Sequence, residues 1–157
     1  MVNNTNLNFK TYAYADLTKQ QLYQVLKLRQ IVFIVEQECA YLDMDAKDFD
    51  SLHVLAYNDD EELLAYARLL PKAVSYPDYV SVGRVVTSPK VRGQRLGYSL
   101  MEFCMQELKR LWPSEGVKLQ AQSYLLDFYK SFGFSPVGEE YLEDDIPHTD
   151  MVLQLSS

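Results

Sequence analysis

The sequence predicts an α/β fold in a single domain, with helices packed on a sheet of mixed strand direction. The chain has 157 residues, the usual length of one domain, and no repeat or Pro/Gly/Ser-rich linker divides it. Segments with the periodicity of amphipathic helices alternate with short segments of strand character. The first strands resemble a meander, and a strand–helix–strand unit in the middle predicts a right-handed parallel crossover.

The first two elements have clear signals. Apolar and polar residues alternate over residues 7–14, as in an edge or half-buried strand. A helix is expected from Thr18 to about Val35, because Thr18 can cap its N-terminus and Gln21, three residues later, completes a capping box. A polar, irregular segment then runs to Asp50 and is long enough to have a function of its own.

The later elements follow from the apolar pattern and the turn residues. Trp112-Pro113 is expected to end the longer of two further helices, and Gly133 the shorter. Strands are expected at residues 53–57, 63–70, 79–87, 117–121, 134–137 and 148–155, and the helices at 97–111 and 125–132.

The composition excludes several classes of function. The chain has 15 Lys and Arg against 22 Asp and Glu, a net charge of -7, so neither nucleic acid nor an anionic membrane is an expected partner. The acidity suits a cationic substrate, although acidic runs such as the one from Asp43 to Asp50 are also typical of solvated loops. No metal is expected, because this run lacks the Gly and the Glu that a calcium loop requires.

Cysteine usage and the absence of apolar runs predict the compartment. Cys39 and Cys104 are isolated and predict reduced thiols rather than a disulfide framework. Residues 1–10 have no signal-peptide pattern, and no apolar run approaches the 18 residues of a membrane span. A cytoplasmic protein is therefore expected.

The segment Val82–Met101 predicts an anion-binding site. A β-branched strand leads through the turn Arg92-Gly93-Gln94-Arg95-Leu96-Gly97 into an amphipathic helix. The first amides of a helix have no intrahelical partner and lie at the positive end of its dipole, so they bind anions. Neither a Walker loop nor a dinucleotide fingerprint fits the turn, and a plain Gly-bearing turn with basic surface residues is the alternative.

Individual residues of this turn have distinct expected roles. Gly93 and Gly97 let the backbone approach a ligand, while Arg92 and Arg95 offer countercharge. The amides from Gln94 to Tyr98 are expected to form the anion cradle.

A second motif about thirty residues later narrows the ligand. It runs from Gln122 to Phe134 and contains Phe128-Tyr129 and Phe132-Gly133-Phe134. The two motifs together resemble the GNAT superfamily of acetyl-CoA-dependent N-acetyltransferases. Four further segments resemble its small ElaA-type branch: Arg29-x-x-x-Phe33-x-x-Glu36-Gln37, Ala65-Tyr66-Ala67-Arg68-Leu69, Gly83-Arg84-Val85 and Ile146-Pro147-His148.

The resemblance implies a mostly antiparallel central sheet flanked by helices, formed by residues 1–157, and acetyl-CoA as donor. The glycine-bearing turn would hold the CoA pyrophosphate, and Val85, Val86 and Thr87 would pair with the pantetheine arm as an added strand does. Two positions depart from the family pattern. Arg95 stands where the pattern usually has its central Gly, and Gln122 stands where an Asn commonly contacts pantetheine.

The resemblance also implies catalytic roles. Attack of an amine on a thioester needs a base for the amine proton, polarisation of the carbonyl and an acid for the thiolate. Tyr129 is the expected acid, Glu36 the candidate base, and the Val86 amide the expected carbonyl donor. His53 and His148 are candidates for substrate binding, and structural histidines at strand starts are the alternative.

The expected function is transfer of an acetyl group from acetyl-CoA to a primary amine by direct attack in a ternary complex. Two alternatives stay open. One is an acyl-homoserine-lactone-synthase-like acyltransferase, whose members share the Arg-x-x-x-Phe-x-x-Glu-Gln segment, and the other is a non-catalytic CoA-binding or interaction module. The acceptor, a small molecule or a peptide, is not specified by the sequence, and a homodimer is the default expectation for a small enzyme.

Overall fold

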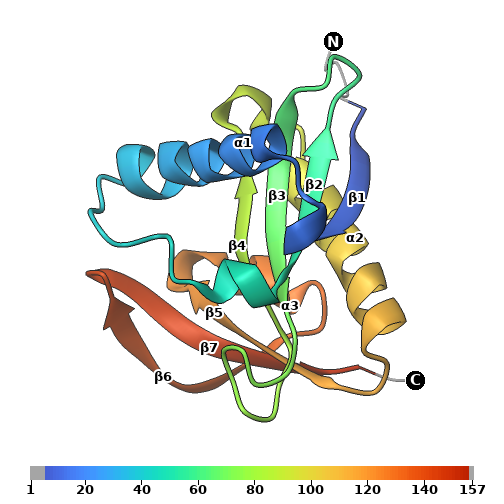
Figure 1. Cartoon of the computed structure of the whole chain (residues 1–157). Helices are drawn as coiled ribbons and strands as arrows, with labels where there is room; N and C mark the ends of the chain where they lie inside the picture. The colour runs from blue at the N-terminus through green and yellow to red at the C-terminus, as the bar shows by residue number, and fades with distance from the viewer. Residues whose placement is uncertain (1–5, 156–157) are drawn as a thin grey trace.

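The structure, a computed structural model, describes residues 6–155; residues 1–5 and 156–157, at the ends of the expected domain, lie outside the described part. It contains two antiparallel sheets (Figure 1). The first has the order β1 (Asn8–Ala13), β2 (Leu52–Tyr57), β3 (Leu63–Leu70) and β4 (Ser81–Thr87). The second has the order β5 (Gly116–Gln122), β7 (Ile146–Gln154) and β6 (Ser135–Glu143). The predicted α/β fold with mostly antiparallel strands is confirmed.

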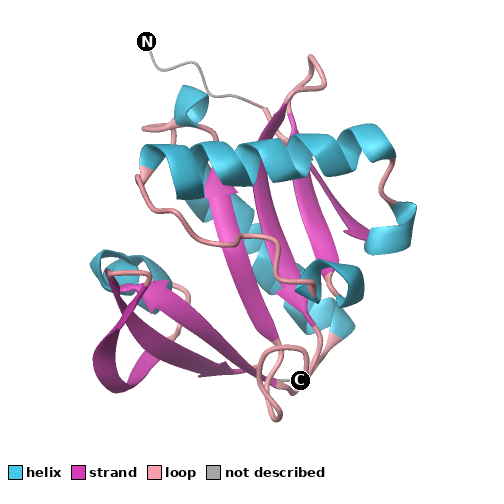
Figure 2. Cartoon of the chain, turned by 60° about the vertical axis from the view of Figure 1, so that its left-hand side comes forward, coloured by secondary structure: helices cyan, strands magenta, loops and turns pink. Residues whose placement is uncertain are grey.

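The two sheets meet at one point and then diverge. Val80, just before β4, forms a parallel bridge with Val117 of β5. The Val80 N–H donates to the Gly116 carbonyl and the Val80 carbonyl accepts from the Lys118 N–H, both at 3.0 Å. Within residues 6–155, β4 and β5 share no further backbone hydrogen bond, and Figure 2 shows the sheets separating from this point. The strands β4 and β5, which precede and follow α2 in the sequence, therefore diverge and leave a gap between them.

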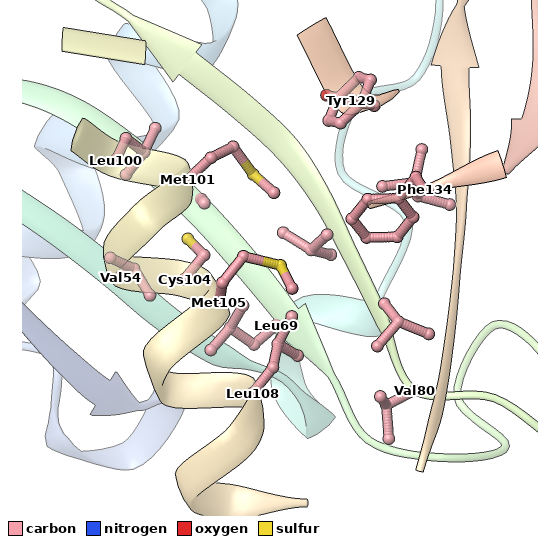
Figure 3. Packing of buried hydrophobic residues seen from close by; sticks show 14 of the residues in the cluster. Val54, Leu69, Val80, Leu100, Met101, Cys104, Met105, Leu108, Tyr129 and Phe134 are labelled. Atoms are coloured by element: carbon pink, nitrogen blue, oxygen red, sulfur yellow. The ribbon is translucent and has the colours of Figure 1, made fainter. Parts of the chain in front are cut away.

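Two helices cover opposite faces of the first sheet. Helix α1 (Lys19–Arg29) packs Val25 and Leu28 against Leu55 and Tyr66. Helix α2 (Leu96–Leu111) packs on the other face, in the main core that also extends to Tyr129 and Phe134 beside the second sheet (Figure 3). The α2 residues in this core are Leu100, Met101, Cys104, Met105 and Leu108.

The helix predicted from Thr18 to Val35 is capped as expected but is not uniform. The Thr18 hydroxyl accepts from the Gln21 N–H at 3.0 Å, and the Gln21 side chain accepts from the Thr18 N–H at 2.9 Å. The α-helix ends at Arg29, and residues Gln30–Glu36 continue as a wider π-helical segment, η2. Such segments are rare and often occur at functional sites.

None of the helices among residues 6–155 is long and apolar enough to span a membrane.

The C-terminal third differs most from the predicted boundaries. The predicted helix 125–132 is a 3₁₀ turn over Ser123–Leu125 followed by the short helix α3 (Leu126–Lys130). Strands β6 and β7 are longer than predicted, because Asp144 and Asp145 join them in a tight turn with φ of 50° and 62°. Left-handed pairs of this kind favour Asn-Gly or Asp-Gly, so Asp-Asp gave little turn signal.

Candidate active site

A cavity of about 850 Å³ opens between the two sheets where β4 and β5 diverge. One wall comes from β4 and the other from β5, α3 and the β6–β7 turn. The end of η2 and the following segment complete it. Of the residues expected to act, eight line this cavity: Val85, Val86, Thr87, Arg92, Gln122, Tyr129, Glu36 and His148.

A β-bulge in β4 shapes the wall that this strand contributes to the cavity. Arg84 has a φ of 49°, and Arg84 and Val85 together lie opposite Ala67 of β3. The extra residue reverses the alternation of the strand, so Val82 packs in the α2 core whereas Val86 packs in the α1 core. Bulges redirect side chains and free backbone groups next to active sites. Residues 85–87 thus line the cavity on the edge that β5 leaves unpaired.

The turn between β4 and α2 has a left-handed backbone at two positions. Gly93 has a φ of 84°, and Arg95 precedes α2 with a φ of 58° and no side-chain cap to the helix amides. Arg95 thus departs from the family pattern at a position whose backbone favours glycine. Its guanidinium lies over the Tyr98 ring, 4.7 Å from the ring centre. At Gly97 an added Cβ would meet only the Phe128 ring, at 3.9 Å.

The structure does not bring this whole turn into the cavity. Arg92 is part of the cavity lining. Gly93, Gln94, Arg95, Gly97 and Tyr98 lie outside the lining, in the turn and the first turn of α2 that follow Arg92. A long ligand that occupies the cavity would reach them only by extending past Arg92 along the chain.

Tyr129 is held firmly at the inner wall of the cavity. Its side chain is 7% exposed and packs edge-to-face on Phe128 and Phe134, with ring centres 5.0 and 6.2 Å away. Burial raises the pKa of the phenol well above its ordinary value. The hydroxyl makes no hydrogen bond within residues 6–155 and stays protonated at neutral pH, as a proton donor requires.

The candidate base lies at the end of η2. A carboxylate oxygen of Glu36 is 2.5 Å from Nη1 of Arg92, and both side chains are partly exposed to solvent. The next residue, Gln37, accepts a hydrogen bond from the side-chain amide of Gln122 at 3.4 Å. Gln37 was not among the predicted site residues, although it lies directly beside the predicted base.

The two histidines have different environments. His148 lines the cavity, and its Nδ1 lies 2.7 Å from the carbonyl of Ile146. His53 is 1% exposed and lies outside the cavity lining, with its ring nitrogens 2.7 Å from the Tyr66 hydroxyl and 2.9 Å from the Asp48 carbonyl. Burial lowers the pKa of His53 and favours its neutral form. The prediction that His53 binds substrate is not supported by this placement; the alternative of a structural histidine fits it.

A buried cluster of charges fixes the segment that forms the third side of the cavity. The guanidinium of Arg29 is fully buried and donates to Asp43 and Asp48, both at 2.8 Å. Arg68 of β3 holds both carboxylate oxygens of Asp45, at 2.8 and 2.9 Å. The third arginine, Arg84 at the bulge, donates to Asp43 at 2.7 Å. The cluster consists of Arg29, Arg68, Arg84, Asp43, Asp45 and Asp48.

These ion pairs correct both expectations for the acidic segment from Asp43 to Asp50, attraction of a cationic substrate and a solvated loop. Three positive charges balance three negative ones, so Asp43, Asp45 and Asp48 neither attract a cation by their net charge nor form a solvated loop. Burial alone would raise the pKa of Asp45, but Arg68 and Arg84 outweigh it and lower the pKa to about 2. A sequence signal existed: Arg68 interrupts an otherwise apolar strand, and a buried arginine needs an acidic partner.

The remaining charge at the cavity is mixed. Glu143 and Asp144, at the β6–β7 turn, line it and have no ion pair within the described residues, whereas Lys47 on the opposite side donates to the Ser75 hydroxyl at 3.1 Å. The acidic β6–β7 turn is therefore the part of the cavity wall best suited to an ammonium group.

Among residues 6–155, no group of three His, Cys, Asp or Glu side chains is arranged to hold a metal ion.

Comparisons with known proteins identify the family of this chain. Residues 13–155 match the family model of the acetyltransferase (GNAT) domain. The protein ElaA of Escherichia coli is 43% identical over 144 residues, which cover 90% of this chain and 93% of ElaA. The crystal structure of E. coli ElaA superposes with a TM-score of 0.86 at 40% identity, covering 94% of this chain and 99% of ElaA.

Two further structures are similar. An acyl-CoA N-acyltransferase from Pseudomonas aeruginosa gives a TM-score of 0.88 at 46% identity, covering 94% of this chain and 99% of that one. The AHL synthase LasI gives 0.75 at 14% identity, covering 97% of this chain and 91% of LasI, a likeness of fold alone. With a family model that spans nearly the whole chain and relatives above 40% identity, this chain belongs to the GNAT acetyltransferase family.

Proposed function

We propose that the protein transfers an acetyl group from acetyl-CoA to a primary amine, by direct attack within a ternary complex. The observation that carries the proposal is the splayed and bulged β4. It places residues 85–87 along the cavity, with Arg92 beyond their C-terminal end and the buried Tyr129 on the opposite wall. The pantetheine arm would lie along residues 85–87, and its phosphates would meet Arg92 and the start of α2.

The proposed reaction is a direct transfer of the acetyl group from the thioester to the amine. The neutral amine attacks the thioester carbon, whose oxygen is polarised by a backbone N–H on the cavity edge of the bulged strand. The Val86 amide expected for this role faces β3 instead, because Val86 pairs with Tyr66 in register with the Ser88 N–H that donates to the Leu64 carbonyl. Glu36 takes one proton from the amine nitrogen, directly or through water, as the N–C bond forms. The C–S bond breaks, and Tyr129 donates its phenolic proton to the departing thiolate. The products are the N-acetylated amine and free CoA, and both side chains then exchange protons with solvent.

The acceptor is proposed to be an amine that is cationic in solution. The support for this is now confined to Glu143 and Asp144, because the acidic segment before β2 is neutralised by arginines. An ammonium group near these carboxylates would be concentrated at the cavity before it loses its proton.

Two measurements test the proposal. Calorimetric titration should show acetyl-CoA binding to the wild-type protein, and thiol release should then be followed with a panel of polyamines, amino sugars, amino acids and peptides. Turnover with an amine supports the proposal. Binding without turnover on a broad panel favours a non-catalytic CoA-binding module, lactone formation from S-adenosylmethionine favours the synthase-like alternative, and no acetyl-CoA binding refutes the assignment of the donor.

A further inference from the structure

The end of η2 contacts two cavity side chains, Arg92 and Gln122, that the sequence analysis expects to bind CoA. Glu36 forms its ion pair with Arg92, at 2.5 Å, and Gln37 accepts a hydrogen bond from Gln122, at 3.4 Å. Arg92 is the residue of the expected pyrophosphate turn that lines the cavity, and Gln122 is the expected contact of pantetheine. Two consecutive residues of one segment thus contact both halves of the expected donor site.

These contacts cross the opening between the sheets. Arg92 follows β4, whereas Gln122 ends β5, on the far side of the gap. A third contact lies two residues further on, where the Cys39 thiol donates to the Asp144 carbonyl at 3.4 Å. We call residues Glu36–Cys39 the strap, because they bridge β4 and the second sheet over the cavity.

We propose that donor binding displaces Glu36 and Gln37 from Arg92 and Gln122, so that the Glu36 carboxylate becomes available as a base only when the thioester is in the cavity. This inference rests on the proposed function. A phosphate group is a stronger bidentate partner for a guanidinium than one carboxylate oxygen of a partly exposed side chain. A pantetheine carbonyl that accepts a hydrogen bond from the Gln122 side chain would take the place of the side-chain oxygen of Gln37.

Mutations in the strap should have the opposite effect on CoA affinity from mutations in an ordinary binding site. Because Glu36 and Gln37 compete with the donor, removing either side chain's contact should tighten CoA binding. An exposed ion pair of this kind is worth about a two- to fivefold change in affinity, so Glu36→Gln is expected to bind CoA about threefold more tightly. The longer hydrogen bond of Gln37 predicts about a twofold gain for Gln37→Ala.

A fragment of the donor separates the two contacts. 3′-Phosphoadenosine 5′-diphosphate contains the phosphates of CoA but no pantetheine. Glu36→Gln should bind this fragment about threefold more tightly, as it does CoA. Gln37→Ala should bind it with wild-type affinity, because the fragment does not reach Gln122. Calorimetric titrations of CoA and of the fragment against each variant give four dissociation constants, which are compared with those of the wild type.

Two controls distinguish displacement from a general effect of charge. Glu38→Gln removes the same charge from an exposed residue of the strap itself, which has no ion pair within the described residues. Its effect on CoA affinity should be smaller than that of Glu36→Gln. In a double-mutant cycle, the gain from Glu36→Gln should disappear when Arg92 is already Gln, and the gain from Gln37→Ala when Gln122 is already Ala.

The outcomes are distinct. Failure of the wild-type protein to bind CoA refutes the proposed function itself. If the wild type binds CoA, the strap inference is overturned by unchanged or weaker binding in Glu36→Gln or Gln37→Ala, or by equal gains in Glu36→Gln and Glu38→Gln. It is supported if both variants bind CoA more tightly than the wild type and only Glu36→Gln also binds the fragment more tightly.

Discussion

Replacing Tyr129 with phenylalanine tests the central chemical step of the proposed reaction. The change removes one oxygen and leaves the ring, which is 7% exposed and packed between Phe128 and Phe134. Because the hydroxyl makes no hydrogen bond within the described part of the chain, its removal leaves no buried partner unsatisfied. Stability should therefore change by no more than about 0.5 kcal/mol. Tyr129→Ala, which removes the ring from the core, should cost about 3–5 kcal/mol.

The expected loss is in turnover. A positioned general acid contributes about 10²–10⁴ to a reaction rate, so Tyr129→Phe should lower kcat at least 100-fold and change the Kd for acetyl-CoA less than about twofold. Burial raises the pKa of the phenol, so the wild-type rate should show no loss of the acid below about pH 10. Thiol release over a pH series measures both effects, and thermal melting checks the fold.

A matched control is available at the same wall of the cavity. Tyr124 also lines the cavity but is 76% exposed, so Tyr124→Phe removes a hydroxyl without an expected catalytic role. Its kcat should stay within about twofold of wild type. A Tyr129→Phe enzyme with wild-type kcat would remove Tyr129 as the acid. Equal losses in the two variants would show only that the cavity is sensitive to polarity.

Three further predictions concern the donor turn and the charge cluster. Gly97→Val should weaken acetyl-CoA binding about tenfold in a calorimetric titration, because its branched side chain blocks the helix amides; wild-type affinity would place the phosphates elsewhere. Asp48→Asn should lower the free energy of unfolding in urea by about 3 kcal/mol, since two buried arginines lose a charged partner; a loss below about 1 kcal/mol would show that the cluster relaxes. The pKa of Asp45 in the folded protein, about 2, lies below its ordinary 3.8, so its contribution is complete above about pH 4 and is lost as pH falls toward 2. This acid loss should amount to about 1–2 kcal/mol after solvent screening and be absent in Asp45→Asn, as measured by denaturation across pH.

Elements that are specified by neighbouring residues were predicted correctly from the sequence. The capping box at Thr18 and strand β3 at residues 63–70 are found as predicted, because side chain–backbone hydrogen bonds and continuous burial leave clear marks in the sequence. The positions of residues 85–87, Arg92 and Tyr129 around one cavity followed from the resemblance of two motifs thirty residues apart.

Features that depend on distant partners were not predictable in the same way. The carboxylates of Asp43 and Asp48 are buried by arginines from α1, β3 and β4, whose proximity only the fold reveals. His53 is equally ambiguous in sequence, because a strand-start histidine can face a cavity or the core. The contacts of Glu36 with Arg92, and of Gln37 with Gln122, cross between the two sheets and have no signature within either segment.

Arg84 shows how the β4 wall and the third side of the cavity, the segment after η2, are fixed by one residue. Its φ of 49° creates the bulge that turns residues 85–87 to the cavity, a backbone conformation that costs a non-glycine residue about 1 kcal/mol or more. Glycine would avoid this strain, but it would lose the two hydrogen bonds that the guanidinium donates to Asp43, at 2.7 and 3.0 Å. The strain is thus offset by contacts that hold the segment after η2 against β4. The geometry of the donor strand and the position of the facing segment are therefore coupled through this side chain.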